Sequence, residues 1–205
     1  MPDPNNCLVH ESKTAFQFIC KACNTSTKKL LVDAHIDAKQ KKAVFRHPQK
    51  HWKFCTKDDI PEDYLVIGFT RHPEERLKSC WKDKLNQPKP FSAFRRIGIP
   101  NNIAFSDFID LIFEIPNNQC DQHFRPMYVD LNLERLDYLV RVEHVNEDWS
   151  TVQKKIFEHS GVSYPTLGKQ NSTSPRTIEI DIKTREKIVN KYCIDYQQFH
   201  YETRL

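Results

Sequence analysis

The stretch CKACNTST, residues 20–27, contains side chains that could serve three different kinds of chemistry. Cys20 and Cys23 have the C-x-x-C spacing of a metal site or a redox pair. Lys21 supplies a cation, and small, amide and hydroxyl side chains follow it, as in a loop that binds phosphate. The stretch contains no glycine, so it is not a Walker A sequence. Taken alone, it is as compatible with an ordinary helix cap as with an anion site.

A second cationic turn begins at Arg71, in the stretch TRHPEERLKS. The planar guanidinium of arginine suits bidentate binding of phosphate better than a lysine ammonium does. Ser79 follows two helical turns later, where its hydroxyl could contact the same anion. The competing interpretation is that Arg76, Ser79 and Asp83 form a solvated helix face, which is the commoner origin of such a pattern.

Both turns come where a strand should end and a helix should begin. The apolar run 15–19 predicts a short buried strand, and the spacing of Leu30, Leu31 and Ala34 predicts a helix after the first turn. The nearly uniform apolar run 64–70 predicts a strand covered on both faces. Strands that alternate with helices predict an α/β fold with a central parallel sheet flanked by helices. In such sheets, ligands bind beyond the carboxyl ends of the strands.

The rest of the chain continues this alternation. We expect a single domain over residues 1–205, with about the first twelve residues flexible. The other predicted elements are a helix from Pro73, a long loop over 86–102, a helix over 106–115, a strand over 137–145, a helix over 146–160 closed by Gly161, and a C-terminal helix from 184 to at least Tyr192.

The composition excludes several classes of protein. Of the 205 residues, 39% are apolar and 28% are charged, which is typical of a globular domain. The net charge of +4 is too small to indicate nucleic-acid binding. No apolar stretch reaches the roughly 18 residues of a membrane span, and the N-terminus does not resemble a secretory signal, so we expect a cytoplasmic chain. The seven dispersed cysteines argue against a disulfide framework.

Together, the two turns resemble the cofactor motifs of a known family. KACNTSTKK is similar to the 5′-phosphosulfate loop, and RHPEERLKS to the 3′-phosphate site, of the membrane-associated carbohydrate sulfotransferases (sulfotransferase family 2), the group of the chondroitin and HNK-1 enzymes. The second motif is the more specific, since the family often has Pro and then Gly or Ala where this chain has Cys20 and Cys23. The resemblance covers residues 15–201, and its further stretches are DQHFRP at 121–126, LVRVEHVNEDW at 139–149, and Asn171 followed by Tyr192, Asp195, Phe199 and Tyr201.

The resemblance implies a P-loop NTPase-like fold and transfer of a sulfuryl group from 3′-phosphoadenosine 5′-phosphosulfate (PAPS) to an acceptor hydroxyl, and the acceptor that it implies is a carbohydrate. Such a transfer needs one cation and one base and no metal. Lys21 would neutralise the leaving phosphate, and His123 would be the base. The alternative is that His123 is a structural or substrate-contacting residue and that another group, such as Glu11 or Glu143, is the base. The expected cofactor residues are Lys21, Ala22, Cys23, Asn24, Thr25, Ser26, Thr27, Arg71 and Ser79, and the expected acceptor residues are Arg95, Arg96 and Arg125.

Several alternatives stay open at this point. Cys20 and Cys23 could join His47 and His51 in a zinc site, although 23 residues separate the pairs, against roughly 12 to 15 in a standard finger. A redox pair, a kinase-type nucleotide-binding protein and a rival alignment of the loop with residues 13–18 are further possibilities. Animal members of the family are anchored in the Golgi by an N-terminal membrane helix, so a truncated Golgi protein is the alternative to a cytoplasmic one.

Overall fold

The computed structural model describes residues 5–88, 91–167 and 178–205. By its internal contacts the chain divides into two compact units. The first, which we call the sheet unit, comprises Met1–Thr70 and Asp130–Ser172, and the second, the helical unit, comprises Arg71–Val129 and Thr173–Leu205. The single domain predicted over residues 1–205 stays a prediction.

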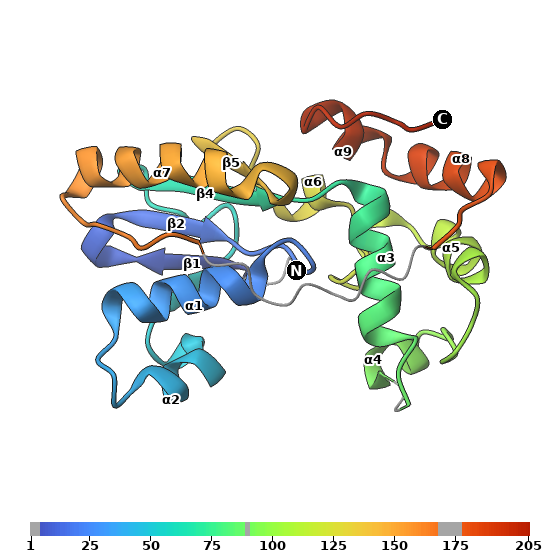
Figure 1. Cartoon of the computed structure of the whole chain (residues 1–205), viewed down its shortest axis with the longest axis horizontal. Helices are drawn as coiled ribbons and strands as arrows, with labels where there is room; N and C mark the ends of the chain where they lie inside the picture. Colours follow the sequence, from blue (N-terminus) through green and yellow to red (C-terminus); the bar gives the residue numbers. More distant parts are fainter. Residues whose placement is uncertain (1–4, 89–90, 168–177) are drawn as a thin grey trace. The chain divides into compact units, whose positions relative to one another are not determined.

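The sheet unit is built on a five-stranded sheet (Figure 1) with the order β3-β1-β2-β4-β5. Strands β2, β4 and β5 run parallel, whereas β1 is antiparallel to both β2 and β3. The predicted α/β fold is confirmed, but the sheet is mixed rather than wholly parallel. The strands are β1 (Asn6–Val9), β2 (Thr14–Gln17), β3 (Lys53–Cys55), β4 (Leu65–Thr70) and β5 (Tyr138–Arg141).

Strand β1 lies within the first twelve residues, a segment for which the sequence predicted flexibility. All four of its residues are buried, and it pairs with β2 on one side and with β3 on the other. This pairing satisfies its backbone groups, which is the usual requirement for burying a chain segment. The sequence did not reveal the strand because an apolar run of three residues, Cys7 to Val9, is too short to show a period.

One face of the sheet is covered by helices α1 (Asn24–His35) and α7 (Val145–Ser160), which run along the strands in Figure 1. Trp149 of α7 packs on Phe16 and on Phe69, with ring centroids 6.4 Å apart in both pairs. The ring of Tyr164 also packs on Phe16, and its hydroxyl bonds to Nε2 of His35 in α1 at 2.8 Å. Aromatic packing on one face therefore holds both helices to the central strands.

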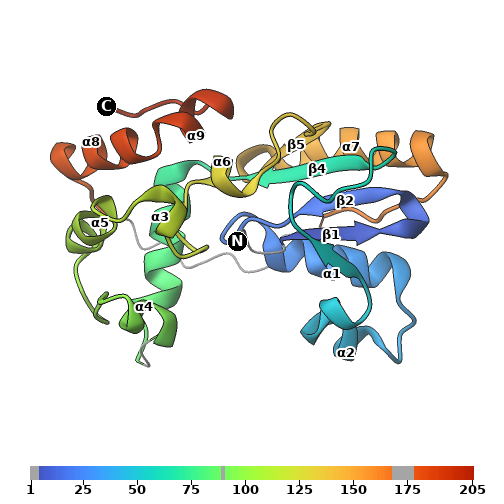
Figure 2. The ribbon, with the colours of Figure 1, turned by 180° about the vertical axis from the view of Figure 1, so that it is seen from behind.

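The opposite face, seen in Figure 2 with β1, β2 and β4 toward the viewer, carries a smaller apolar cluster. Loop side chains hold the backbone of this side in place. The carboxylate of Asp137 accepts a hydrogen bond from the N–H of Val66 at 2.7 Å, and the guanidinium of Arg135 donates to the carbonyls of Ile60 and Pro61. The cluster consists of Leu8, Ala15, Cys55, Ile60, Tyr64 and Val66, with Leu136 packed against them.

The helical unit has its own aromatic core. Phe94 and Phe108 each pack on Phe124, at centroid distances of 5.4 and 6.0 Å. Phe94 belongs to α4 (Ser92–Arg96), a short helix inside the stretch that the sequence predicted to be a loop. The predicted C-terminal helix is two helices, which break at Tyr192. The helices are α3 (Pro73–Lys84), α4, α5 (Phe105–Phe113), α6 (Met127–Asp130, ending in the sheet unit), α8 (Ile182–Lys191) and α9 (Cys193–Gln198).

Shorter elements complete the chain. Within the described ranges, no helix combines the length and the apolar sequence that crossing a bilayer would require. The remaining elements are η1 (His10–Ser12), α2 (Lys41–Arg46), η2 (Pro48–Lys50), η3 (Asn117–Gln119) and η4 (Val142–His144).

Candidate functional site

The turn between β2 and α1 has a distinctive backbone. Lys21 and Cys23 both lie in the left-handed region, with φ of 70° and 56°. Left-handed residues are common in backbone concavities that bind anions. Here the N–H of Ala22 between them is used inside the turn, where it donates to the carbonyl of Ile19 at 3.1 Å. Helix α1 begins at Asn24, its first-turn N–H groups have no acceptor within the helix, and its first turn contains no acidic residue. The local geometry therefore suits a negatively charged group.

The side chains of this turn differ in their access to solvent. Thr25 is exposed, and Ser26 retains 8% of its surface. Thr27 is fully buried, and its hydroxyl donates to the carbonyl of Cys23 at 3.1 Å. Ala22 is also buried, with 1% of its surface exposed. Thr27 thus stabilises the turn from inside, so among the predicted hydroxyls Thr25 and Ser26 are the ones that can face a ligand.

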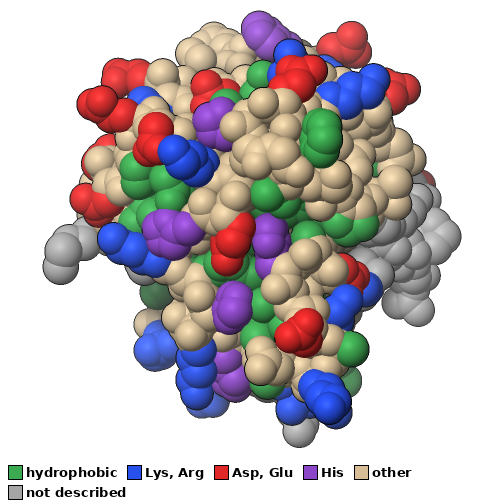
Figure 3. Space-filling view, turned by 90° about the vertical axis from the view of Figure 1, so that its left-hand side faces the viewer, with side chains coloured by type: hydrophobic (Ala, Val, Ile, Leu, Met, Phe, Trp, Pro, Cys, Tyr) green, Lys and Arg blue, Asp and Glu red, His purple; other side chains and the backbone are tan. Residues whose placement is uncertain are grey.

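The structure does not bring the four residues of the zinc alternative together. Cys20 and Cys23 are half-buried, whereas His47 and His51 are exposed. Figure 3 shows histidine side chains on the surface at the end of the sheet unit where α1 and α7 end. In residues 5–88, 91–167 and 178–205, however, no group of three His, Cys, Asp or Glu side chains could hold a metal ion.

The rival alignment of the loop with residues 13–18 is contradicted by the fold. Residues Thr14–Gln17 form strand β2, and the exposed fractions of Gln17 and Phe18 are 0% and 5%. A buried strand cannot present its backbone N–H groups to a ligand, because the neighbouring strands use them. Of the two alignments, only the one that places the loop at the turn beginning at Lys21 remains.

The two cationic turns follow adjacent strands of the sheet. Strands β2 and β4 are parallel neighbours, with Gln17 opposite Gly68. Arg71 directly follows Thr70, the last residue of β4, and the turn with Lys21 follows β2. Parallel strands have their carboxyl ends at one edge of the sheet, where α/β proteins bind ligands. The chain therefore leaves the sheet at this edge in both turns.

Helix α3 buries part of the face that the competing interpretation placed in solvent. Arg76 and Ser79 keep only 1% and 7% of their surface, whereas Asp83 is exposed. The solvated-face interpretation is thus wrong for Arg76 and Ser79. Nη1 of Arg76 donates to the carbonyl of Arg125 at 2.7 Å, and Nη2 donates to the carbonyl of Gln122 at 3.1 Å. The sequence analysis did not predict that Arg76 is buried and bonded to a distant segment. The only signal was that the motif contains a second arginine.

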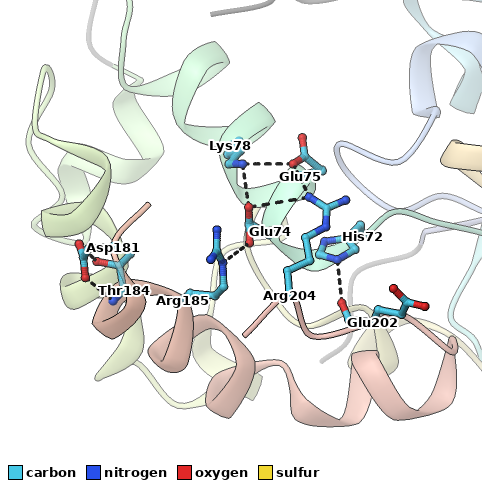
Figure 4. A network of polar contacts seen from close by, with 9 residues as sticks. All are labelled: His72, Glu74, Glu75, Lys78, Asp181, Thr184, Arg185, Glu202 and Arg204. Carbon is cyan, nitrogen blue, oxygen red and sulfur yellow. Dashed lines mark hydrogen bonds and ion pairs between the residues drawn. The ribbon is translucent and has the colours of Figure 1, made fainter. Parts of the chain in front are cut away.

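Ion pairs hold the first turn of α3 to the C-terminal part of the chain (Figure 4). The carboxylate of Glu74 is buried and accepts from Lys78 at 2.7 Å and from Nε of Arg185 at 3.1 Å. Burial raises the pKa of Glu74, but the hydrogen bonds and charges of Lys78 and Arg185 outweigh it and leave the pKa below its usual value. His72 bonds through Nε2 to the carbonyl of Glu202 at 3.1 Å. The residues next to Arg71 are therefore fixed on two sides.

His123 is oriented by a carboxylate. Its Nδ1 lies 2.6 Å from Oδ1 of Asp121, and its backbone N–H donates to the same oxygen at 2.9 Å. Burial raises the pKa of Asp121, but the hydrogen bonds from His123 outweigh burial and leave this pKa below its usual value, so the carboxyl is ionised and can only accept. Nδ1 must then carry the proton, which leaves the lone pair of a neutral ring on Nε2, as a general base requires.

The predicted acceptor residues do not all have the same surroundings. Phe94 of α4 packs edge-on against the His123 ring with centroids 5.9 Å apart, and the next two residues, Arg95 and Arg96, are exposed. Arg125 is half-buried, and its Nε donates to the carbonyl of Cys120 at 2.9 Å. Arg95 and Arg96 thus lie in the same part of the helical unit as His123, whereas Arg125 helps to hold its own loop.

The two alternative bases belong to the sheet unit, and one further motif is structural. Glu11 in η1 and Glu143 in η4 are exposed residues of the sheet unit. In the stretch LVRVEHVNEDW, the carboxylate of Asp148 accepts from the backbone N–H of Arg141 at 2.9 Å and from its Nε at 3.1 Å, which joins β5 to α7. Asn171 lies outside the described residues.

Comparison with known proteins gives one match. A model of the sulfotransferase family matches residues 7–202, which include both cationic turns, the segment of His123 and the C-terminal tyrosines. No curated protein and no solved structure matches the chain. Because the family model covers nearly the whole sequence, the chain belongs to the sulfotransferase family.

Proposed function

We propose that the protein transfers a sulfuryl group from PAPS to a hydroxyl of a carbohydrate. Family membership supports sulfotransfer, and one observation carries the choice of donor. The turn with Lys21 and the turn with Arg71 follow adjacent parallel strands, so two cationic turns leave the same edge of the sheet. PAPS has two separate anionic groups, the 5′-phosphosulfate and the 3′-phosphate, and each turn would bind one of them.

The turn with Lys21 fits the 5′-phosphosulfate. In the transfer, the bond between sulfur and the bridging oxygen breaks while the acceptor oxygen bonds to sulfur, so negative charge grows on the leaving phosphate. The ammonium of Lys21 and the N–H groups at the start of α1 would stabilise this charge, with the hydroxyls of Thr25 and Ser26 beside them. The left-handed backbone at Lys21 and Cys23 supports this assignment.

The start of α3 fits the 3′-phosphate. The guanidinium of Arg71 provides two parallel donors, and the hydroxyl of Ser79 on the following helix provides a third. The 3′-phosphate distinguishes PAPS from ATP, so these two residues would determine the choice of nucleotide. A kinase-type protein, the second candidate, would not need a cation and a hydroxyl for this group.

His123 fits the role of general base. Its Nε2 would take the proton of the acceptor hydroxyl, and the ionised Asp121 on Nδ1 would stabilise the imidazolium that forms. The exposed Arg95 and Arg96 follow the ring that packs on His123, where they would bind acidic groups of the acceptor. Because Nε of Arg125 bonds to Cys120, the acceptor assignment rests on Arg95 and Arg96.

Calorimetric titration with adenosine 3′,5′-bisphosphate and with AMP tests the nucleotide assignment. Arg71→Ala should weaken binding of the bisphosphate by about 1.5–3 kcal/mol, the usual effect of losing a hydrogen bond to a charged group, which is roughly a tenfold to 150-fold rise in Kd. Binding of AMP should stay unchanged. Arg96→Ala, which removes an exposed arginine assigned to the acceptor, is the matched control and should bind both nucleotides as the parent does.

Transfer of labelled sulfate from PAPS to a panel of glycans tests the chemistry. Lys21→Ala should abolish transfer while the variant still binds adenosine 3′,5′-bisphosphate through the 3′-phosphate turn. An Arg71→Ala variant that binds the bisphosphate as tightly as the parent would contradict the role of that turn. Full transfer by Lys21→Ala would contradict the role of the loop.

A further inference from the structure

The C-terminal pattern Tyr192, Asp195, Phe199, Tyr201 has no part in the chemistry proposed above, and neither does Arg76. Three of these side chains carry polar groups and are nonetheless buried, with exposed fractions of 1% for Tyr192, 0% for Asp195 and 1% for Arg76. Burying a polar group is costly unless it makes hydrogen bonds. The partners of these groups therefore indicate what the burial achieves.

All three side chains bond to the backbone of one segment, residues 122–128. The hydroxyl of Tyr192 donates to the carbonyl of Phe124 at 2.5 Å. The carboxylate of Asp195 accepts from the backbone N–H of Met127 at 2.8 Å and from that of Tyr128 at 2.9 Å. Two residues of one short C-terminal segment thus hold the backbone just after His123.

Arg76 holds the same segment from helix α3. Its guanidinium donates to the carbonyls of Gln122 and Arg125, at 3.1 and 2.7 Å. With the bond from Tyr192, the carbonyls of residues 122, 124 and 125 are all held by buried side chains. His123 lies between the first two of these carbonyls. Its backbone is therefore fixed by side chains from α3 and from the C-terminal helices, in a segment that has no regular secondary structure before Met127.

We propose that Arg76, Tyr192 and Asp195 are positioning residues that hold residues 122–128 so that the ring of His123 keeps Nδ1 on Asp121 and Nε2 available for the acceptor. The proposal rests on the proposed role of His123 as the base. A base acts only in a narrow range of distances, and a displacement of about 1 Å can lower a rate by roughly a hundredfold. Arg76 also belongs to α3, which carries Ser79, so the helix assigned to the 3′-phosphate is bonded directly to the segment of the base.

A matched pair of variants separates positioning from a general contribution to stability. Tyr192→Phe removes the hydroxyl that bonds to Phe124 and keeps the ring. Tyr164→Phe removes another buried hydroxyl, in the sheet unit, where it bonds to Ser12 and to His35 at 2.8 Å each. Both variants should lower Tm. Only Tyr192→Phe should lower kcat, by about tenfold to a hundredfold, with the KM for PAPS unchanged.

Nitrogen NMR of the histidine side chains gives a second readout that does not depend on catalysis. In the parent, His123 should show the Nδ1–H form alone when neutral, because Asp121 accepts that proton. Tyr192→Phe should show both neutral forms of His123, whereas Tyr164→Phe should give the parent spectrum for His123. Equal losses of Tm in the two variants, with kcat and the His123 spectrum both unchanged in Tyr192→Phe, would overturn the proposal.

Two further results complete the test. Arg76→Lys keeps the buried positive charge but replaces the two nitrogens that bond to the carbonyls with a single one on a shorter side chain. It should therefore reproduce the effect of Tyr192→Phe. Parent values of kcat and of the His123 spectrum in a folded Arg76→Lys variant would contradict the proposal. If the parent protein does not bind adenosine 3′,5′-bisphosphate, the proposed function fails instead. The His123 spectrum then still decides the positioning, since a second neutral form in Tyr192→Phe supports it and an unchanged spectrum overturns it.

Discussion

The left-handed backbone at Cys23 predicts that glycine at this position stabilises the protein. Cys23 has φ of 56° and ψ of 10°, a conformation that costs a residue with a side chain roughly 1–2 kcal/mol. Glycine avoids this cost but loses more backbone entropy on folding, about 0.5–1 kcal/mol relative to Ala. Cys23→Gly should therefore raise the free energy of unfolding by about 0–1.5 kcal/mol, which corresponds to a Tm higher by up to roughly 6 °C.

A second cysteine provides the matched control. Cys193 is exposed, is the first residue of α9, and is not one of the residues with positive φ. Cys193→Gly gains nothing from the backbone and should lower the free energy of unfolding by about 0.5–1 kcal/mol. Cys23→Val should also be destabilised, because a β-branched side chain tolerates the left-handed region least. Urea unfolding of the three variants measures these differences.

Binding of adenosine 3′,5′-bisphosphate links the same variants to function. Cys23→Gly keeps the turn in its conformation, so its Kd should equal that of the parent. Cys23→Val should bind more weakly, because the turn must change its conformation to relieve the strain. If Cys23→Gly is destabilised as much as Cys193→Gly, the turn does not have the left-handed geometry on which the assignment of the anion site depends.

Three other predictions concern the scaffold of the two units. Gly68→Ala should lower the Tm, because a Cβ at this position would lie 2.7 Å from Cδ1 of Leu136, and overpacking of this kind costs typically about 1–3 kcal/mol; a parent Tm would show that Leu136 can move aside. Phe124→Ala should cost about 3–5 kcal/mol in urea unfolding, since it empties the centre of the aromatic core, and a loss below about 1 kcal/mol would contradict that packing. The pKa of Glu74 is lowered in the folded state, so its ionised form stabilises the protein above the unfolded pKa near 4.5, and this contribution is lost as the pH falls through the folded pKa. The urea midpoint should therefore fall more steeply as the pH drops below about 4.5 in the parent than in Glu74→Gln, and parallel pH profiles would show that Lys78 and Arg185 do not stabilise the carboxylate.

The sequence predicts the longer elements well because their physical signals are local. The apolar run before Arg71 identifies β4, and Pro73 gives the start of α3, both of which the structure confirms. Gly161 ends α7 with φ of 72°, as the C-cap position requires. Strand β3, with three residues, and helix α4, with five, are too short to show a period, so they were not predicted.

The missed features of the candidate site depend on contacts between distant residues. The burial of Arg76 follows from acceptors 46 and 49 positions later in the chain, which no local pattern reveals. Tyr192 and Phe124 are 68 positions apart, so the sequence marks the C-terminal pattern without indicating what it holds. The left-handed φ of Lys21 and Cys23 is equally hidden, because glycine is the usual signal for that conformation and the turn contains none.

The central claim is that this protein binds a nucleotide through a 3′-phosphate as well as through its 5′ group. Calorimetric titration of the parent protein with adenosine 3′,5′-bisphosphate and with AMP tests it most directly. If Arg71 and Ser79 bind the 3′-phosphate, the bisphosphate should bind at least tenfold more tightly than AMP, the factor that corresponds to about 1.4 kcal/mol. Equal affinity for the two nucleotides, or tighter binding of AMP, would contradict the assignment of PAPS as the donor.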